Sequence, residues 1–160
     1  MTLILVPIAA DADPAALARD LAGGFGGDEA PARALLEQTF ALLTSDPRPH
    51  PWGCYLAELE GQKIGTCAFK SAPTKAGEVE LAYMTFPAFE GRGHATAMAG
   101  ALTRIAEAAG AAMAIAHTLP EENASNRALG RNGYTLAGEV QDPEDGLVWR
   151  WEKPLGSASQ

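Results

Sequence analysis

The sequence predicts an α/β fold with a mixed, twisted central sheet of six or seven strands and flanking helices. Residues 52–59 and 63–70 alternate in polarity around a short turn, which is typical of an antiparallel hairpin. Residues 78–118 read as strand, helix and strand, which is typical of a parallel crossover unit. Because both kinds of strand pairing are indicated, the sheet is predicted to be mixed. The sequence contains no internal repeat and no linker that divides two domains.

Length and composition are ordinary for one globular domain. The chain has 160 residues, 47% of them hydrophobic and 20% charged, so we expect one domain over 1–153 and a flexible tail over 154–160. The net charge of −8 argues against non-specific binding to nucleic acid or anionic membranes, and mildly favours amine substrates. The apolar run at 2–8 is too short for a signal peptide or a membrane span. The expected location is the cytoplasm.

The N-terminal third is expected to supply one strand and two helices. Residues 2–8 are rich in Leu, Ile and Val and predict the first strand. Asp13 followed by Pro14 is typical of a helix start. That helix is expected to end before a flexible glycine segment at 23–27, and a second apolar-faced helix is predicted over 31–43.

The middle of the chain contains the most informative local pattern. Residues 78–86 favour a strand, and Gly91 and Gly93 then allow a tight turn. A helix with one apolar face is predicted over 94–109, with Gly110 as its left-handed cap. Such a turn aims unpaired N–H groups and a helix N-terminus outward, which suits a phosphate or pyrophosphate.

Other glycine-rich motifs fit this turn less well. A P-loop needs Gly-Lys-Ser/Thr at the helix start, where this chain has Gly93-His94-Ala95. A dinucleotide-binding fingerprint needs a small residue where Thr96 stands. An ordinary strand-to-helix turn, with glycines that serve geometry alone, stays open on these residues.

The C-terminal third is expected to complete the sheet. A strand is predicted over 111–118, a short helix over 122–131, and a closing pair of strands over 134–140 and 146–152.

The two cysteines are expected to be reduced packing residues. Cys54 and Cys67 would lie opposite each other if Glu60 and Gly61 form the turn of a tight hairpin, and that would permit a disulfide under oxidation. The sequence has no Cys-x-x-Cys and only three scattered histidines. No metal site is therefore predicted.

Two segments resemble the GNAT superfamily of N-acetyltransferases, and in particular its branch of ribosomal-protein N-terminal acetyltransferases. The run from Glu90 to Ala95 is similar to the acyl-CoA pyrophosphate loop, Gln/Arg-x-x-Gly-x-Gly/Ala, except that Glu90 departs at the first position. Residues 117–134 resemble Asn-x-x-Ser-x-x-x-Leu-x-Lys-x-Gly-Phe. Four positions of that second motif are in register, namely Ser125, Leu129, Gly133 and Tyr134, whereas Glu122 replaces its asparagine and Arg131 its lysine.

The resemblance implies a GNAT fold in which the fourth and fifth strands splay apart and acetyl-CoA binds between them. Strand residues would bond the pantetheine arm through the backbone, and the amides of 91–96 would hold the pyrophosphate. Two asparagines that open the later helix would bond pantetheine or act only as helix caps. The expected cofactor-binding residues are Met84, Thr85, Phe86, Gly91, Arg92, Gly93, His94, Ala95, Thr96, Asn123 and Asn126.

The implied reaction is direct transfer of acetyl from acetyl-CoA to a primary amine, on a protein N-terminus or a small molecule. Glu80 stands where family members often carry the base, His117 ends the fifth strand, and Ser125 would replace the usual tyrosine acid, whose position is Leu129. Each candidate also has a purely structural interpretation. Glu80 would be a surface carboxylate, His117 a packed and hydrogen-bonded histidine, and Ser125 a helix-start hydroxyl that bonds the backbone. Glu78, on the same face as Glu80, is a weaker candidate.

The missing tyrosine and the departure at Glu90 leave a second function open, a catalytically silent acyl-CoA-binding or interaction module of the same fold. The sequence does not identify the amine acceptor. Enzymes that the sequence resembles are often dimers, so a homodimer is also expected as a possible assembly.

Overall fold

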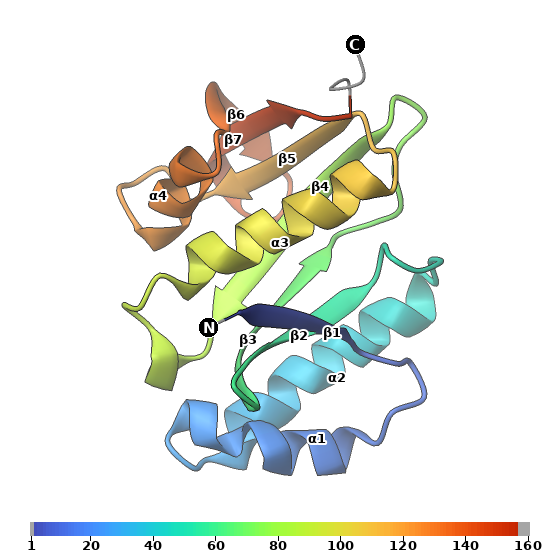
Figure 1. Cartoon of the computed structure of the whole chain (residues 1–160), viewed down its shortest axis with the longest axis vertical. Coiled ribbons are helices and arrows are strands. Elements are labelled where there is room, and N and C mark those ends of the chain that lie inside the picture. The colour runs from blue at the N-terminus through green and yellow to red at the C-terminus, as the bar shows by residue number, and fades with distance from the viewer. Residues whose placement is uncertain (1, 157–160) are drawn as a thin grey trace.

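Seven strands form one mixed sheet, as the sequence pattern predicts. The computed structural model describes residues 2–156, and the strands lie in the order β1-β2-β3-β4-β5-β7-β6 (Figure 1). Neighbouring strands are antiparallel except for β4 and β5, which are parallel. The strands are β1 (Leu3–Pro7), β2 (Cys54–Leu59), β3 (Gln62–Phe69), β4 (Glu78–Thr85), β5 (Met113–Thr118), β6 (Thr135–Asp142) and β7 (Gly146–Pro154). The helices are α1 (Pro14–Leu21), α2 (Glu29–Ser45), α3 (His94–Ala108) and α4 (Ala124–Arg131).

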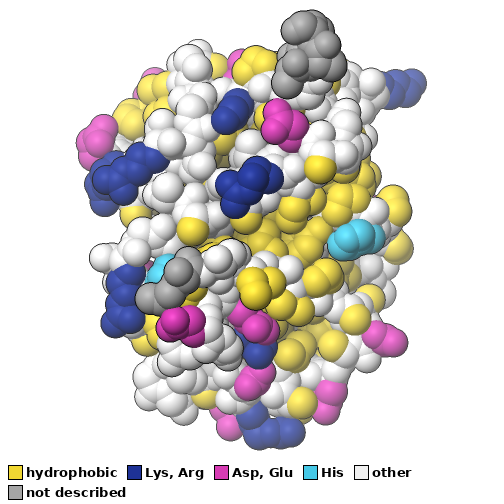
Figure 2. All heavy atoms as spheres, in the orientation of Figure 1, with side chains coloured by type: hydrophobic (Ala, Val, Ile, Leu, Met, Phe, Trp, Pro, Cys, Tyr) yellow, Lys and Arg dark blue, Asp and Glu magenta, His cyan; other side chains and the backbone are white. Residues whose placement is uncertain are grey.

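Helices cover the sheet on both faces and create two hydrophobic cores. Met98 and Leu102 of α3 pack into one core, and Leu21 of α1 and Leu36 of α2 pack into the other. Strand side chains alternate between these cores, since successive side chains of a strand point to opposite faces. Figure 2 shows hydrophobic side chains gathered over the middle of the face that carries α3, with acidic and basic side chains around them.

Helix boundaries follow from local capping. Asp13 Oδ1 accepts a hydrogen bond from the N–H of Ala15 at 3.0 Å, as expected for an N-cap followed by proline. The second helix begins at Glu29, two residues before the predicted start, because the Asp28 side chain caps it in the same way. Gly110 follows α3 with a φ of 89°, which confirms the left-handed cap.

The glycine segment at 23–27 contains an ordered turn, whereas the sequence predicts a flexible break. Residues Ala22–Phe25 form one turn of 3-10 helix, in which Gly24 is buried. A Cβ atom on Gly24 would lie 2.8 Å from Cβ of Phe86, so glycine is required for close packing on the residue that follows β4.

A bulge in the β2–β3 hairpin changes the relation of the two cysteines. Glu58 pairs with Lys63, but Ala57 pairs with Gly65, so Ile64 is an extra residue on β3. Cys54 therefore does not lie opposite Cys67, and the expected pairing is wrong. The two cysteines belong to the two different cores, and both are free and buried, which confirms the expectation of packing residues.

The ordered C-terminus extends slightly beyond the expected domain end. β7 runs to Pro154, and Leu155 is buried and donates its N–H to the carbonyl of Ala112 at 2.8 Å. The last four residues of the expected tail, 157–160, lie outside the described part of the chain. Within residues 2–156, no helix has both the length and the apolar character needed to cross a membrane.

Candidate active site

The central parallel strands separate soon after they meet. β4 and β5 pair only over Glu78–Glu80 and Met113–Ile115, although β4 continues to Thr85. β5 pairs along its whole length with β7 on its other side. Beyond Glu80, β4 has no neighbouring strand on this edge among the described residues, and a cleft of about 640 Å³ opens there. The cleft is lined by Tyr83, Met84, Thr85, Glu90, Gly91, Gly93, His94, Ala95, Thr96, Ala124, Ser125, Arg127 and Arg131.

Backbone direction decides which residues next to the cleft can bond a ligand. The N–H of Phe86 donates to the carbonyl of Ile64 on β3 at 2.9 Å. Because backbone groups alternate between the two edges of a strand, Met84 also turns its groups to β3, whereas Tyr83 and Thr85 turn theirs to the cleft. The expectation of main-chain bonds from Met84 and Phe86 is therefore corrected. Of the three predicted residues only Thr85 turns its backbone groups to the cleft, as Tyr83 also does, whereas Met84 lines the cleft without doing so.

The glycine turn presents backbone amides to the cleft. Gly91 and Gly93 have φ values of 80° and 82°, and a Cβ atom on either would meet nothing within 4 Å. Gly93 caps α3 without a side-chain hydrogen bond, and the N–H of Ala97 is the first to bond back, to the carbonyl of Gly93. The amides of residues 94–96 therefore lack helical acceptors and, with the helix dipole, favour an anion. Glu90 is exposed at the edge of this site.

Positive charge reaches the cleft from α4, which the sequence did not single out. Arg127 and Arg131 line the cleft. The guanidinium of Arg92 instead lies 5.9 Å from the ring centroid of Phe89, and Arg92 is not one of the lining residues. Burial, followed by the charge of Arg92, lowers the pKa of His94. At neutral pH His94 is therefore uncharged and can donate one hydrogen bond to a ligand.

The two asparagines that open α4 are engaged with the protein. Asn123 is the N-cap, and its side-chain oxygen accepts from the N–H of Asn126 at 2.9 Å. Asn126 is 4% exposed, and its oxygen accepts from Trp151 Nε1 at 2.8 Å. Its amide nitrogen donates to the carbonyls of Leu119 and Glu121. Helix capping and core bonding thus account for both side chains, and Asn126 has no free group to offer pantetheine.

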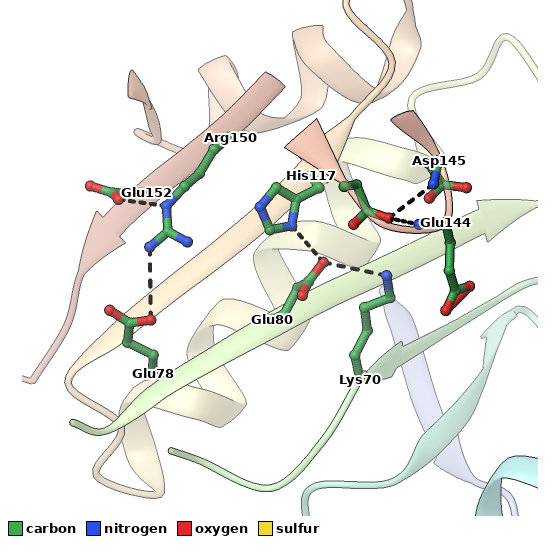
Figure 3. Close-up of polar contacts among 9 residues, drawn as sticks. Lys70, Glu78, Glu80, His117, Glu144, Asp145, Arg150 and Glu152 are labelled. Atoms are coloured by element: carbon green, nitrogen blue, oxygen red, sulfur yellow. Dashed lines mark hydrogen bonds and ion pairs between the residues drawn. The ribbon is translucent and has the colours of Figure 1, made fainter. Parts of the chain in front are cut away.

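Two of the three predicted catalytic residues touch each other. His117 Nδ1 lies 2.8 Å from Glu80 Oε2, and Lys70 Nζ lies 3.4 Å from the same oxygen (Figure 3). Glu80 is the last residue of β4 that pairs with β5, and His117 lies two residues beyond its partner Ile115. The pair therefore stands where the two strands begin to diverge. Since a carboxylate only accepts, His117 Nδ1 donates to it, and in the neutral ring Nε2 is left as the acceptor.

Ser125 connects this pair to the cleft. A hollow of about 130 Å³ holds Lys70, Glu80, His117 and Ser125, and Ser125 also lines the larger cleft. The hydroxyl of Tyr83 donates to the backbone carbonyl of Ser125 at 3.1 Å, which fixes α4 to β4 across the gap. Glu80, His117 and Ser125 thus surround one hollow, as their predicted roles require.

Glu78, the weaker candidate, is engaged elsewhere on the same sheet face. Its Oε1 lies 3.7 Å from Arg150 Nη2, and Arg150 Nε donates to Glu152 at 2.7 Å (Figure 3). No contact of Glu78 with His117 is found among the described residues. Glu78 therefore serves as a natural control for Glu80.

An acidic hairpin lies beside the Glu80–His117 pair. Asp142 Oδ1 accepts from the N–H groups of Glu144 and Asp145 at 2.8 and 2.9 Å, and these bonds hold the pKa of Asp142 below its usual value. The positive charge of Lys70, and that of His117 when it is protonated, contribute further to lowering that pKa. In the described range 2–156, no group of three or more His, Cys, Asp and Glu side chains could hold a metal ion.

The mixed sheet with its splayed parallel pair, β4 and β5, matches the fold of GNAT acetyltransferases. The sequence model of the family described as "Acetyltransferase (GNAT) domain" matches residues 2–135. The chain therefore belongs to the GNAT acetyltransferase family. A search of curated protein sequences found no significant match.

Solved structures of other acetyltransferases share this fold at low sequence identity. The microcin C7 self-immunity acetyltransferase MccE, in complex with acetyl-CoA and AMP, is 15% identical with a TM-score of 0.73, over 96% of this chain and 93% of that one. Mycobacterium smegmatis RimJ, in complex with CoA-disulfide, is 18% identical with a TM-score of 0.74, over 99% and 84%. AAC(6')-Ib, in complex with paromomycin and acetyl-CoA, is 19% identical with a TM-score of 0.72, over 96% and 94%.

Proposed function

We propose that this protein transfers the acetyl group of acetyl-CoA directly to a primary amine, on a protein N-terminus or a small molecule. The Glu80–His117 contact carries the proposal. It lies where β4 and β5 diverge, beside a cleft whose other end is the amide-rich start of α3. The proposed proton acceptor and anion site thus lie in two adjoining hollows, and both hollows are lined by Tyr83 and Ser125.

The residues of the cleft fit acetyl-CoA chemically. The backbone groups of Tyr83 and Thr85 would pair with the pantetheine amides like an added strand. The free amides of residues 94–96 would hold the pyrophosphate in the open space in front of Gly91 and Gly93. Arg127 and Arg131 would add positive charge near the phosphates. When bound, acetyl-CoA supplies the thioester carbonyl that the amine attacks.

His117 is the proposed proton acceptor. Its Nε2 would take a proton from the incoming ammonium, while Glu80 orients the ring and stabilises the imidazolium. The free amine then forms the bond from nitrogen to the acyl carbon and the carbon–sulfur bond breaks. The nitrogen loses its extra proton, and one proton passes to the departing thiolate to give the CoA thiol. Ser125 lines both hollows, and its hydroxyl would donate a hydrogen bond to the departing sulfur. Lys70 competes with the amine for Glu80 but is exposed and can move away.

An acceptor screen tests the proposal. The purified protein would be incubated with acetyl-CoA and a panel of peptides and small amines, and acetylated products would be identified by mass spectrometry together with released CoA thiol. We expect at least one amine to be acetylated, with thiol release that depends on that amine. Tight binding of acetyl-CoA without transfer to any amine would favour the silent acyl-CoA-binding module. We also propose that the protein resides in the cytoplasm.

A further inference from the structure

A second hollow, of about 260 Å³, lies between α2 and the sheet, on the face that carries Glu80. Leu35 and Leu42 of α2 line one side, and Ala68, Ala82 and Met84 of the sheet line the other. Met84 is 39% exposed, although it is a large apolar side chain in a strand. The hollow, here called the α2 groove, is therefore an apolar surface that stays open to solvent.

The two threonine hydroxyls of the α2 groove are already engaged with backbone carbonyls, and Gln38, which also lines the groove, is exposed to solvent. Thr39 Oγ1 donates to the carbonyl of Leu35 at 3.0 Å, and Thr66 Oγ1 donates to the carbonyl of Tyr55 at 3.0 Å. Burial raises the pKa of the Cys54 thiol, which therefore stays uncharged at neutral pH. None of the residues that line this groove is charged. Gln38 is thus the main neutral polar partner that the groove offers, and a cationic ligand would lose hydration there without gaining an ionic partner.

The α2 groove opens directly onto the Glu80–His117 site. Ala82 and Tyr83 line both the groove and the smaller hollow that holds Glu80 and His117. Ala82 follows Glu80 by two residues on the same face of β4, a separation of about 7 Å along the strand. The carboxylates of Glu80 and Asp142 place negative charge where the groove meets the Glu80–His117 site, whereas the groove itself is apolar. This arrangement complements a molecule with an ammonium group at one end and an apolar group a few bonds away.

We propose that the acceptor is a primary amine that carries one compact apolar substituent near its nitrogen, which occupies the α2 groove. The volume is below the range of drug-sized sites, so the groove accommodates a group of about side-chain size. A peptide whose first residue is Leu or Met and a branched alkylamine share this chemistry. Polyamines and polyhydroxylated amino sugars do not. The inference rests on the proposed acetyl transfer.

Paired acceptors test the assignment. We would compare kcat/KM for two short peptides that differ only in a first residue of Leu or Ser, and for isopentylamine and ethanolamine. Contact of an apolar substituent with an apolar site discriminates by about 10-fold or more, so both apolar members should be preferred to that extent. A preference confined to the peptides would identify a protein N-terminus as the source of the amine, and a preference confined to the alkylamines would identify a small molecule. Equal use of both members of each pair would overturn the assignment.

A variant that fills the groove gives an independent test. Ala68→Leu should lower kcat/KM for the Leu peptide about 10-fold but leave a Gly peptide and acetyl-CoA affinity unchanged. The control is Ala41→Leu, the same change at an exposed position of α2 outside the groove lining. If Ala68→Leu acts equally on the Leu and Gly peptides, the groove does not hold the substituent. Transfer to no amine at all would instead remove the proposed function, and the acceptor assignment with it.

Discussion

A negative charge at Gly93 should abolish tight acetyl-CoA binding if the start of α3 holds the pyrophosphate. Gly93 caps α3 in front of open space, so an aspartate side chain there would project toward the proposed phosphate position. At about 5 Å and an effective dielectric constant of about 20, each unit charge of phosphate is opposed by ~3 kcal/mol. That repulsion corresponds to a loss of affinity of roughly 150-fold or more.

Gly93→Asn separates charge from backbone strain in this experiment. Asparagine has almost the same shape as aspartate and faces the same left-handed φ of 82°, at a shared cost of about 1 kcal/mol. Both variants and the wild type would be titrated with acetyl-CoA by calorimetry, with circular dichroism as the check of folding. We expect Gly93→Asn to bind far better than Gly93→Asp. Equal, near-wild-type affinities would refute the reasoning, because no phosphate could then lie at this helix start.

Two further predictions concern stability. Burial raises the pKa of Cys67 and of Tyr134 to about 12, and it also raises that of Tyr83. Above about pH 9–10 the unfolded chain loses these protons while the folded chain keeps them. The free energy of unfolding should therefore fall as pH rises, by about 1.4 kcal/mol per pH unit for each group. Urea unfolding at pH 8 and pH 10.5 measures this fall, and equal unfolding midpoints would contradict the prediction. Asn126→Ala should lower the free energy of unfolding by about 1–3 kcal/mol, because it removes the buried amide that bonds Trp151 Nε1, the Thr118 hydroxyl and the carbonyls of Leu119 and Glu121. Calorimetry of the folded variant should give acetyl-CoA affinity within about 3-fold of wild type. A large loss of affinity at unchanged stability would instead show that Asn126 contacts the cofactor.

The order of helices and strands could be predicted because local residues mark where these elements start or turn. Asp13 with Pro14 starts α1, and Gly91 and Gly93 turn the chain between β4 and α3. The bulge at Ile64 could not be predicted, because one extra residue in a hairpin leaves the alternation on either side intact. That single residue placed Cys54 and Cys67 in different cores.

The site was only partly predictable because its chemistry depends on tertiary contacts. Glu80 and His117 were each recognisable by position, but they lie on separate strands and their contact depends on the β4–β5 register. The place of Arg127 and Arg131 in the cleft was not predicted, because a charged residue on a short helix most often faces solvent. Asn126 fitted a ligand role in sequence, yet its burial against Trp151 follows from the way α4 packs on β7.

The most direct test of the account is the single-turnover rate of acetyl transfer in His117→Gln and Glu80→Gln at saturating acetyl-CoA. Glu78→Gln is the matched control, since Glu78 shares the strand and face of Glu80 but pairs with Arg150. The account predicts a fall of about 10²-fold or more for His117→Gln and a substantial fall for Glu80→Gln. It also predicts little change for Glu78→Gln and unchanged acetyl-CoA affinity in all three. Transfer at the wild-type rate in His117→Gln would contradict the account.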